Sequence, residues 1–160
     1  GGACQDDRVG VEIERKFLVI GDAWRDGAVA SRIRQAYLVR GPGRSVRIRD
    51  EDGRITLTIK GPGSGLDGMT RDEFEYELPT DDADGIFALC EPGTIDKTRH
   101  RIDVAGRTWE VDEFHGALAP LVVAEVELDD PAAEVVLPPW AGQEVTGDPS
   151  YSNGALSRRA

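Results

Sequence analysis

Apolar and polar residues alternate with a period of two along most of the chain, which is the pattern of strands with one buried face. The first such run reads Val-Glu-Ile-Glu-Arg-Lys-Phe-Leu-Val over residues 11–19. Seven further runs follow the same pattern, at 33–40, 45–50, 54–60, 71–78, 95–104, 107–114 and 121–128. Helical patterns are short and are confined to 22–30, 81–90 and 151–158. The sequence therefore predicts a mainly β (α+β) domain, an eight-stranded antiparallel barrel or sandwich with a few short helices.

The polar positions of these strands are almost all fully charged, and their sign differs from strand to strand. Acidic residues dominate the first, seventh and eighth predicted strands, as with Glu125 and Glu127 in the eighth. Basic residues dominate the third, fourth and sixth, as with Arg47 and Arg49 in the third. A sandwich whose polar faces meet water would usually intersperse the two signs. The sandwich remains the alternative, but the pattern favours a barrel lumen that holds cations on one wall and phosphates on the other.

The chain has 160 residues and a formal net charge of -11, which indicates one domain without general affinity for nucleic acid or an anionic membrane. No apolar stretch approaches the length needed to cross a bilayer. The two cysteines, Cys4 and Cys90, are too few for a disulfide framework, so we expect reduced thiols in a cytoplasmic protein. We expect a flexible leader over residues 1–9, partly derived from an expression tag, and a single domain over 10–160.

Several motifs occur in an order that carries a family resemblance. They are Glu12-Ile13-Glu14-Arg15-Lys16, Gln35-Ala36-Tyr37-Leu38, Val46-Arg47-Ile48-Arg49, Thr58-Ile59-Lys60, Lys97-Thr98-Arg99, Val111-Asp112 and Glu125-Val126-Glu127. In this order the chain resembles the CYTH domain proteins, also called triphosphate tunnel metalloenzymes. It departs from them at Ala36, where glycine is usual, and at His100, where many relatives have tyrosine. Strand alternation directs His100 away from the lumen.

The resemblance implies an eight-stranded antiparallel β-barrel tunnel with short helices flanking it on the outside. Carboxylates at positions i and i+2 of a strand share one face, so they can share a hard cation such as Mg²⁺ or Mn²⁺. The expected metal ligands are Glu12, Glu14, Asp112, Glu125 and Glu127. The bases expected to bind the phosphate chain are Lys16, Arg47, Arg49, Lys60, Lys97 and Arg99. Ion pairs between these acids and bases across the lumen are the alternative.

The expected reaction is metal-assisted attack of water on the terminal phosphorus of a small-molecule triphosphate. Glu73 and Glu75 are candidate general bases, and the resemblance adds Tyr37, whose hydroxyl could equally orient the substrate. Inorganic triphosphate is the first choice of substrate. The alternatives are a nucleoside or thiamine triphosphatase, an adenylate cyclase, and a non-catalytic polyphosphate-binding module. We expect neither a nucleic-acid nor a membrane partner, and a monomer or homodimer.

Overall fold

The structure is a computed structural model that describes residues 10–63 and 71–160. The expected leader, with Cys4, lies outside the described residues, and so do the side chains of Glu12 and Arg71. The strands are β1 (Gly10–Glu12), β2 (Glu14–Val19), β3 (Val29–Arg40), β4 (Ser45–Glu51), β5 (Arg54–Gly63), β6 (Arg71–Leu78), β7 (Ile95–Val104), β8 (Arg107–Phe114), β9 (Val122–Glu127) and β10 (Ala141–Glu144). The helical segments are η1 (Ala23–Arg25), η2 (Thr80–Asp82), α1 (Ala83–Ala88), η3 (Gly116–Leu118), η4 (Pro149–Tyr151) and α2 (Asn153–Arg159).

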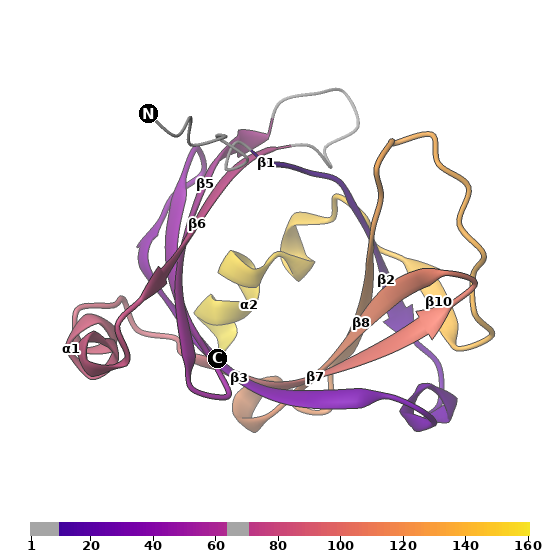
Figure 1. Ribbon diagram of the computed structural model, residues 1–160, viewed down its shortest axis with the longest axis horizontal. Helices are drawn as coiled ribbons and strands as arrows, with labels where there is room; N and C mark the ends of the chain where they lie inside the picture. Colours follow the sequence, from indigo (N-terminus) through magenta and orange to yellow (C-terminus); the bar gives the residue numbers. More distant parts are fainter. Residues whose placement is uncertain (1–9, 64–70) are drawn as a thin grey trace, which may run out of the picture.

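The strands form one antiparallel sheet that curls around a central opening (Figure 1). Its order is β1-β6-β5-β4-β3-β7-β8-β9-β2-β10, so the sheet has two ends and is not closed into the barrel that we expected. The run predicted as one first strand is divided at Ile13, because β1 pairs with β6 whereas β2 pairs with β9. The division and the unpredicted β10 account for the ten strands of the described residues, where eight were predicted. The antiparallel tunnel-like fold is nevertheless confirmed.

The strand register brings the predicted charged faces together on the inside of the curled sheet. Gln35 on β3 is opposite Arg49 on β4, which is opposite Thr56 on β5. Arg99 on β7 is opposite Asp112 on β8. Because alternate residues of a strand share a face, these pairs place whole rows of charged side chains on one side of the sheet.

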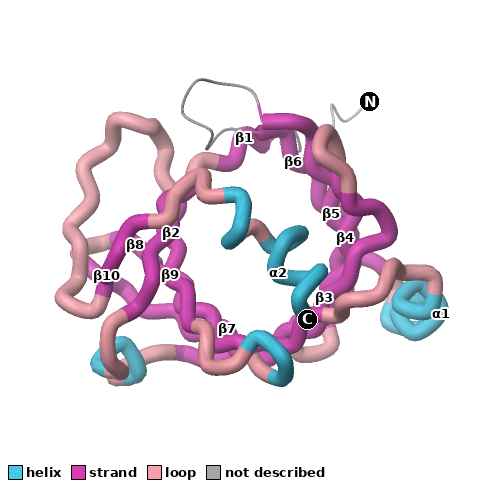
Figure 2. Tube along the Cα trace, turned by 180° about the vertical axis from the view of Figure 1, so that it is seen from behind, coloured by secondary structure: helices cyan, strands magenta, loops and turns pink. Residues whose placement is uncertain are grey.

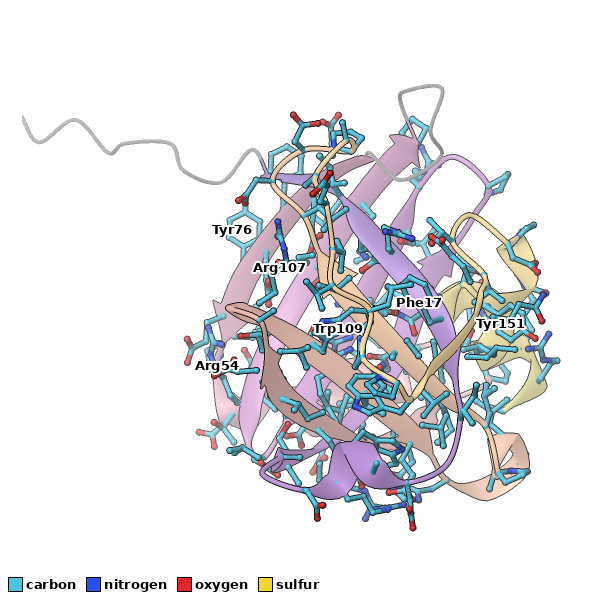
Figure 3. All side chains as sticks on the ribbon, turned by 90° about the vertical axis from the view of Figure 1, so that its right-hand side faces the viewer. Phe17, Arg54, Tyr76, Arg107, Trp109 and Tyr151 are labelled. Atoms are coloured by element: carbon cyan, nitrogen blue, oxygen red, sulfur yellow. The ribbon has the colours of Figure 1, made fainter. Side chains whose placement is uncertain are left out.

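The largest apolar cluster lies on the outer face, where Phe17, Trp24, Trp109 and Trp140 are buried. The rings of Phe17 and Trp109 have centroids 5.5 Å apart, and Figure 3 shows both residues on the same side of the molecule. The rings of Trp24 and His100 are in edge-on contact, with their centroids 4.7 Å apart. The outward direction predicted for His100 is thus confirmed.

The helices are shorter than their sequence patterns. The helix predicted over 22–30 is reduced to η1, because Gly27 has a positive φ of 75° and β3 begins at Val29. The helix predicted over 81–90 becomes α1 with η2 before it. Ala83 of α1 packs on the outward-facing Ala36 and Ile48, as expected for a flanking helix. No helix in the described part of the chain has the length and apolar character required to cross a membrane.

Helix α2 differs from the expectation, because it packs on the inner face of the sheet. Its Leu156 is buried with Ile95, Phe114 and Val123. Each of the three lies two residues along its strand from an inward-facing charged residue (Lys97, Asp112 and Glu125, respectively) and therefore shares its face. Together they form an apolar end of the lumen. Both views along the opening show α2 within the ring of strands (Figures 1 and 2).

A glycine permits the close approach of α2 to the chain before β7. Gly93 has φ +106°, and a Cβ added there would lie 2.0 Å from the backbone oxygen of Ser157. The N-terminus of α2 is capped by Ser152, whose Oγ accepts a hydrogen bond of 3.1 Å from the amide of Ala155. Helix α2 therefore fills one end of the lumen, and the charged part of the lumen lies beyond it.

Candidate active site in the tunnel

The inner face of the sheet encloses a cavity of about 350 Å³, which we call the tunnel cavity. Nine of the residues that the sequence singled out line it, namely Glu14, Arg47, Arg49, Lys60, Glu73, Glu75, Arg99, Glu125 and Glu127. They come from β2, β4, β5, β6, β7 and β9, so residues far apart in the sequence meet in one place. A second cavity of about 400 Å³ adjoins it, because Glu14, Lys60 and Asn153 line both. Lys16 and Tyr37 line this second cavity.

The two arginines of β4 are held by neutral groups. The Nε and Nη2 of Arg49 donate hydrogen bonds of 2.9 and 2.7 Å to the Oε1 of Gln35. The Nη2 of Arg47 donates to the Oγ1 of Thr58 at 3.4 Å, while its buried Nε has no hydrogen-bond partner among the described residues. Burial and the nearby charges of Arg47 and Arg99 lower the pKa of Arg49 to about 9. An anion bound in the tunnel cavity would relieve this repulsion.

The bases of β7 are held by carboxylates. The Nζ of Lys97 lies 2.7 Å from the Oδ2 of Asp112, and the Nε of Arg99 lies 2.8 Å from its Oδ1. Arg99 also pairs with Glu110 at 3.2 Å. Burial opposes ionisation of Asp112, but the charges of Arg99 and Lys97 hold its pKa well below the usual range. Arg99 reaches the tunnel cavity, whereas Lys97 and Asp112 are buried behind it and do not line it.

The acids of β2 and β9 face each other across the strand pair. Glu14 is opposite Glu127, and Lys16 is opposite Glu125. The Nζ of Lys16 lies 3.5 Å from the Oε1 of Glu125. Burial disfavours the charged form of Glu125, but Lys16, Arg99 and Lys97 together hold its pKa at about 2. Glu125 is therefore ionised near neutral pH.

The acidic side of the tunnel cavity suits a hard divalent cation that shares ligands with its substrate. Glu14, Glu125 and Glu127 line the cavity from adjacent strands. Among the described residues, however, no three His, Cys, Asp or Glu side chains lie close enough together to hold a metal ion by themselves. Mg²⁺ commonly takes only one or two protein carboxylates and completes its shell with waters and substrate phosphates. The donor set fits such an ion. Glu12, whose side chain is not described, lies two residues before Glu14 in the sequence.

The candidate general bases occupy different places. Glu73 and Glu75 line the tunnel cavity from β6, where Glu75 is opposite Thr58 and Glu73 is opposite Lys60. Tyr37 is 6% exposed and lines the second cavity instead. The two glutamates thus share the tunnel cavity with Arg47 and Arg49, whereas Tyr37 is the cross-strand neighbour of Arg47 but opens to the second cavity.

Some residues of the cavities were not assigned a role from the sequence. Glu51, Arg101 and Glu110 line the tunnel cavity, and they share strand faces with Arg49, Arg99 and Asp112, so alternation could have identified them. Asn153 lines both cavities from α2. No pattern in the sequence indicated that this helix would lie inside the sheet.

Comparison with known proteins agrees with this geometry. A protein of Acetivibrio thermocellus named inorganic triphosphatase is 44% identical over 149 residues, which cover 92% of this chain and 94% of that protein. A protein of Nitrosomonas europaea with the same name is 36% identical over 152 residues, covering 91% and 96%. The crystal structure of an inorganic triphosphatase matches with a TM-score of 0.64 at 32% identity and covers 91% of this chain and 93% of that one. The family model described as CYTH domain matches residues 10–156, and the chain therefore belongs to the CYTH domain family.

Proposed function

We propose that this chain is a divalent-metal-dependent triphosphatase that cleaves inorganic triphosphate to diphosphate and phosphate in the tunnel cavity. The observation that carries the proposal is the lining of that cavity, where the arginines of β4 share one space with the acids of β2 and β9. Bases grip a polyanion, and the acids give a place for the metal ions that accompany it. The two relatives named inorganic triphosphatase support the same substrate.

The lining also favours an inorganic chain over a nucleotide. No aromatic side chain lines the tunnel cavity within the ranges 10–63 and 71–160. Nucleotide sites usually offer an apolar or aromatic surface to the base. The charged lining is instead suited to a ligand that is anionic along its whole length, such as inorganic triphosphate.

The bases of the tunnel would grip the substrate and stabilise the charge that develops on the leaving diphosphate. Arg47 and Arg49 present planar guanidinium groups, which match phosphate oxygens in pairs. Lys60 and Arg99 line the same cavity, and Lys16 lies in the adjoining one. Because Asp112 is engaged by both Lys97 and Arg99, we assign it to holding these bases in place.

The acids would hold the metal ion and accept the proton of the attacking water. Glu14, Glu125 and Glu127, with Glu12, are the proposed ligands of Mg²⁺ or Mn²⁺. When bound, such an ion supplies charge neutralisation and a lower pKa for coordinated water. Glu73 and Glu75 line the cavity and are the proposed proton acceptors. Tyr37, in the second cavity, is assigned to orienting the end of the substrate.

The proposal is tested by phosphate release from inorganic triphosphate, ATP and thiamine triphosphate, each with Mg²⁺, with Mn²⁺ and with excess chelator. We expect inorganic triphosphate to be cleaved fastest and chelation to abolish cleavage. Glu14→Gln and Glu127→Gln should lose nearly all activity and still unfold cooperatively, since removing one of several neighbouring acids relieves repulsion.

The control is Glu134→Gln, which changes an exposed acid between β9 and β10 and should retain wild-type activity. Full activity of Glu14→Gln or Glu127→Gln in excess chelator would contradict the metal mechanism. A wild-type preference for ATP would contradict the substrate.

A further inference from the structure

A buried amide stands behind the arginine that faces the phosphate chain in the proposed function. Gln35 on β3 is 0% exposed and does not line the tunnel cavity, whereas Arg49 does. Its Oε1 accepts two hydrogen bonds from Arg49, at 2.9 and 2.7 Å. Arginine has only donors, so the contacting atom must be the carbonyl oxygen of the amide, and the orientation of Gln35 follows.

This orientation leaves the Nε2 of Gln35 buried without a hydrogen-bond partner among the described residues. A buried polar group without a partner costs free energy. A glutamate at this position would bind the guanidinium more strongly, because charge-assisted hydrogen bonds are the stronger ones. If the only task were to hold Arg49 in place, the carboxylate would therefore serve better than the amide.

Arg99 shows what the carboxylate arrangement looks like in the same tunnel. Its guanidinium is held by Asp112 at 2.8 Å and lies 3.2 Å from Glu110, so its charge is compensated by neighbours. The ion pairs formed by the described residues include Arg99 and Arg101 but not Arg49. A neutral acceptor fixes the position of Arg49 and leaves its positive charge available.

We propose that Gln35 is a positioning residue that fixes Arg49 through a neutral acceptor, so that the charge of Arg49 is kept for the phosphate chain of the substrate. The inference rests on the proposed function, since it assigns a purpose to a guanidinium that forms no ion pair among the described residues. Any hydrogen-bond acceptor at position 35 would hold Arg49 in place. Only a neutral acceptor also leaves the positive charge of Arg49 unpaired.

The test compares Gln35→Glu, Gln35→Met and Arg49→Met by two measurements. One is the Kd for inorganic triphosphate by calorimetry in excess chelator, where no turnover occurs, and the other is the KM with Mg²⁺. We expect Gln35→Glu to raise both by about tenfold or more, because the new carboxylate neutralises Arg49 and repels phosphate. Gln35→Met, which loosens Arg49 without neutralising it, should raise them less than Gln35→Glu and less than Arg49→Met.

The matched control is Gln143→Glu on β10, which adds the same charge at an exposed position and should change the Kd by less than about twofold. Thermal unfolding should show Gln35→Glu to be as stable as the wild type or more stable, since it gains an ion pair.

A purely structural role for Gln35 predicts the opposite order, with Gln35→Glu equal to the wild type and Gln35→Met weaker, and that result would overturn the inference. Should Gln35→Glu fail to fold, the decisive pair is Gln35→Met and Arg49→Met, and equal loss of binding in these two would also overturn it. If the wild type itself neither binds nor cleaves inorganic triphosphate, the proposed function fails. Tight binding by both the wild type and Gln35→Glu defeats only the role of Gln35.

Discussion

Two stretches of the tunnel wall carry positive charge, and they differ in the groups that hold the charged side chains. On the β4 wall, Arg47 and Arg49 are held by a threonine hydroxyl and an amide. On the β7 wall, Lys97 and Arg99 are held by the carboxylate of Asp112. Buried charges need partners, and the β7 wall finds them within the protein. Among the described residues, Arg47 and Arg49 of the β4 wall form no ion pair with a carboxylate, so their charges are available to a ligand. The hydrogen-bond partners of a base in the lumen thus show whether its charge is already compensated within the protein, as for Lys97 and Arg99, or is left for a ligand, as for Arg47 and Arg49.

The largest expected effect is on the β7 wall. Asp112→Asn would leave Lys97 and Arg99 buried without their shared carboxylate, so the free energy of unfolding should fall by about 3 to 5 kcal/mol. Denaturant unfolding monitored by tryptophan fluorescence measures this loss. The control is Asp96→Asn, whose carboxylate pairs with Arg32 at 2.7 Å on the surface and should cost less than about 1 kcal/mol. Equal losses in the two variants would show that the β7 wall gains no stability from burial of its pair.

Substitutions in the β4 wall should lower catalytic activity more than stability. Arg47→Ala and Arg49→Ala should each lower kcat/KM for inorganic triphosphate by about 10², because each removes a charge that faces the substrate in a confined site. Their unfolding free energies should fall far less than that of Asp112→Asn, since removing one of several like charges relieves repulsion. Steady-state kinetics and denaturant unfolding of the same preparations separate the two effects.

Arg44→Ala is the matched control for the β4 wall. Arg44 lies in the turn before β4 and is exposed, so its removal should leave kcat/KM nearly unchanged. If Arg44→Ala were inactive while Arg47→Ala and Arg49→Ala remained active, the inward direction assigned to the β4 arginines would be wrong, and the comparison of the two walls would fail.

The sequence predicted which side chains face the lumen but not what each one contacts. Alternation alone directs Arg47, Arg49 and Arg99 inward, because a strand has only two faces. The contact between Arg99 and Asp112 depends in addition on the register of β7 against β8, which pairs these two residues. Alternation leaves that register open, so the sequence could not distinguish a carboxylate that holds bases from one that binds metal.

The sequence also could not predict which end of the lumen is apolar and which part is charged. Ile95 and Phe114 share inward faces with charged residues, and only the packing of Leu156 on them shows that one end of the lumen is apolar. Strand β10 was missed because its four residues, Ala-Gly-Gln-Glu, have no apolar alternation. Among the described strands it pairs with β2 alone, through an irregular register. In both places a contact distant in sequence decides the local structure.

The smallest expected effect concerns the point where the two walls meet. Glu51 on β4 accepts hydrogen bonds from Arg101 on β7, at 2.8 Å, and from Ser31 on β3, at 2.7 Å. Burial opposes ionisation of Glu51, but these two hydrogen bonds lower its pKa below the usual value. A carboxylate with a lowered pKa stabilises the fold above its unfolded-state pKa, about 4.3, and this contribution is lost as the pH falls through the folded-state pKa.

Glu51→Gln should therefore lower the free energy of unfolding at pH 7 by no more than about 1 kcal/mol, because the pair is partly exposed. The difference from the wild type should shrink as the pH falls below about 4.3, since the protonated acid and the amide are then alike in charge. Denaturant unfolding at intervals between pH 7 and pH 3 measures this difference, with Glu134→Gln as the exposed control for the loss of one negative charge. A difference that stays constant over the whole range would mean that Glu51 connects β4 to β7 through packing and hydrogen bonds alone. The negative charge of Glu51 would then contribute nothing to its contact with Arg101.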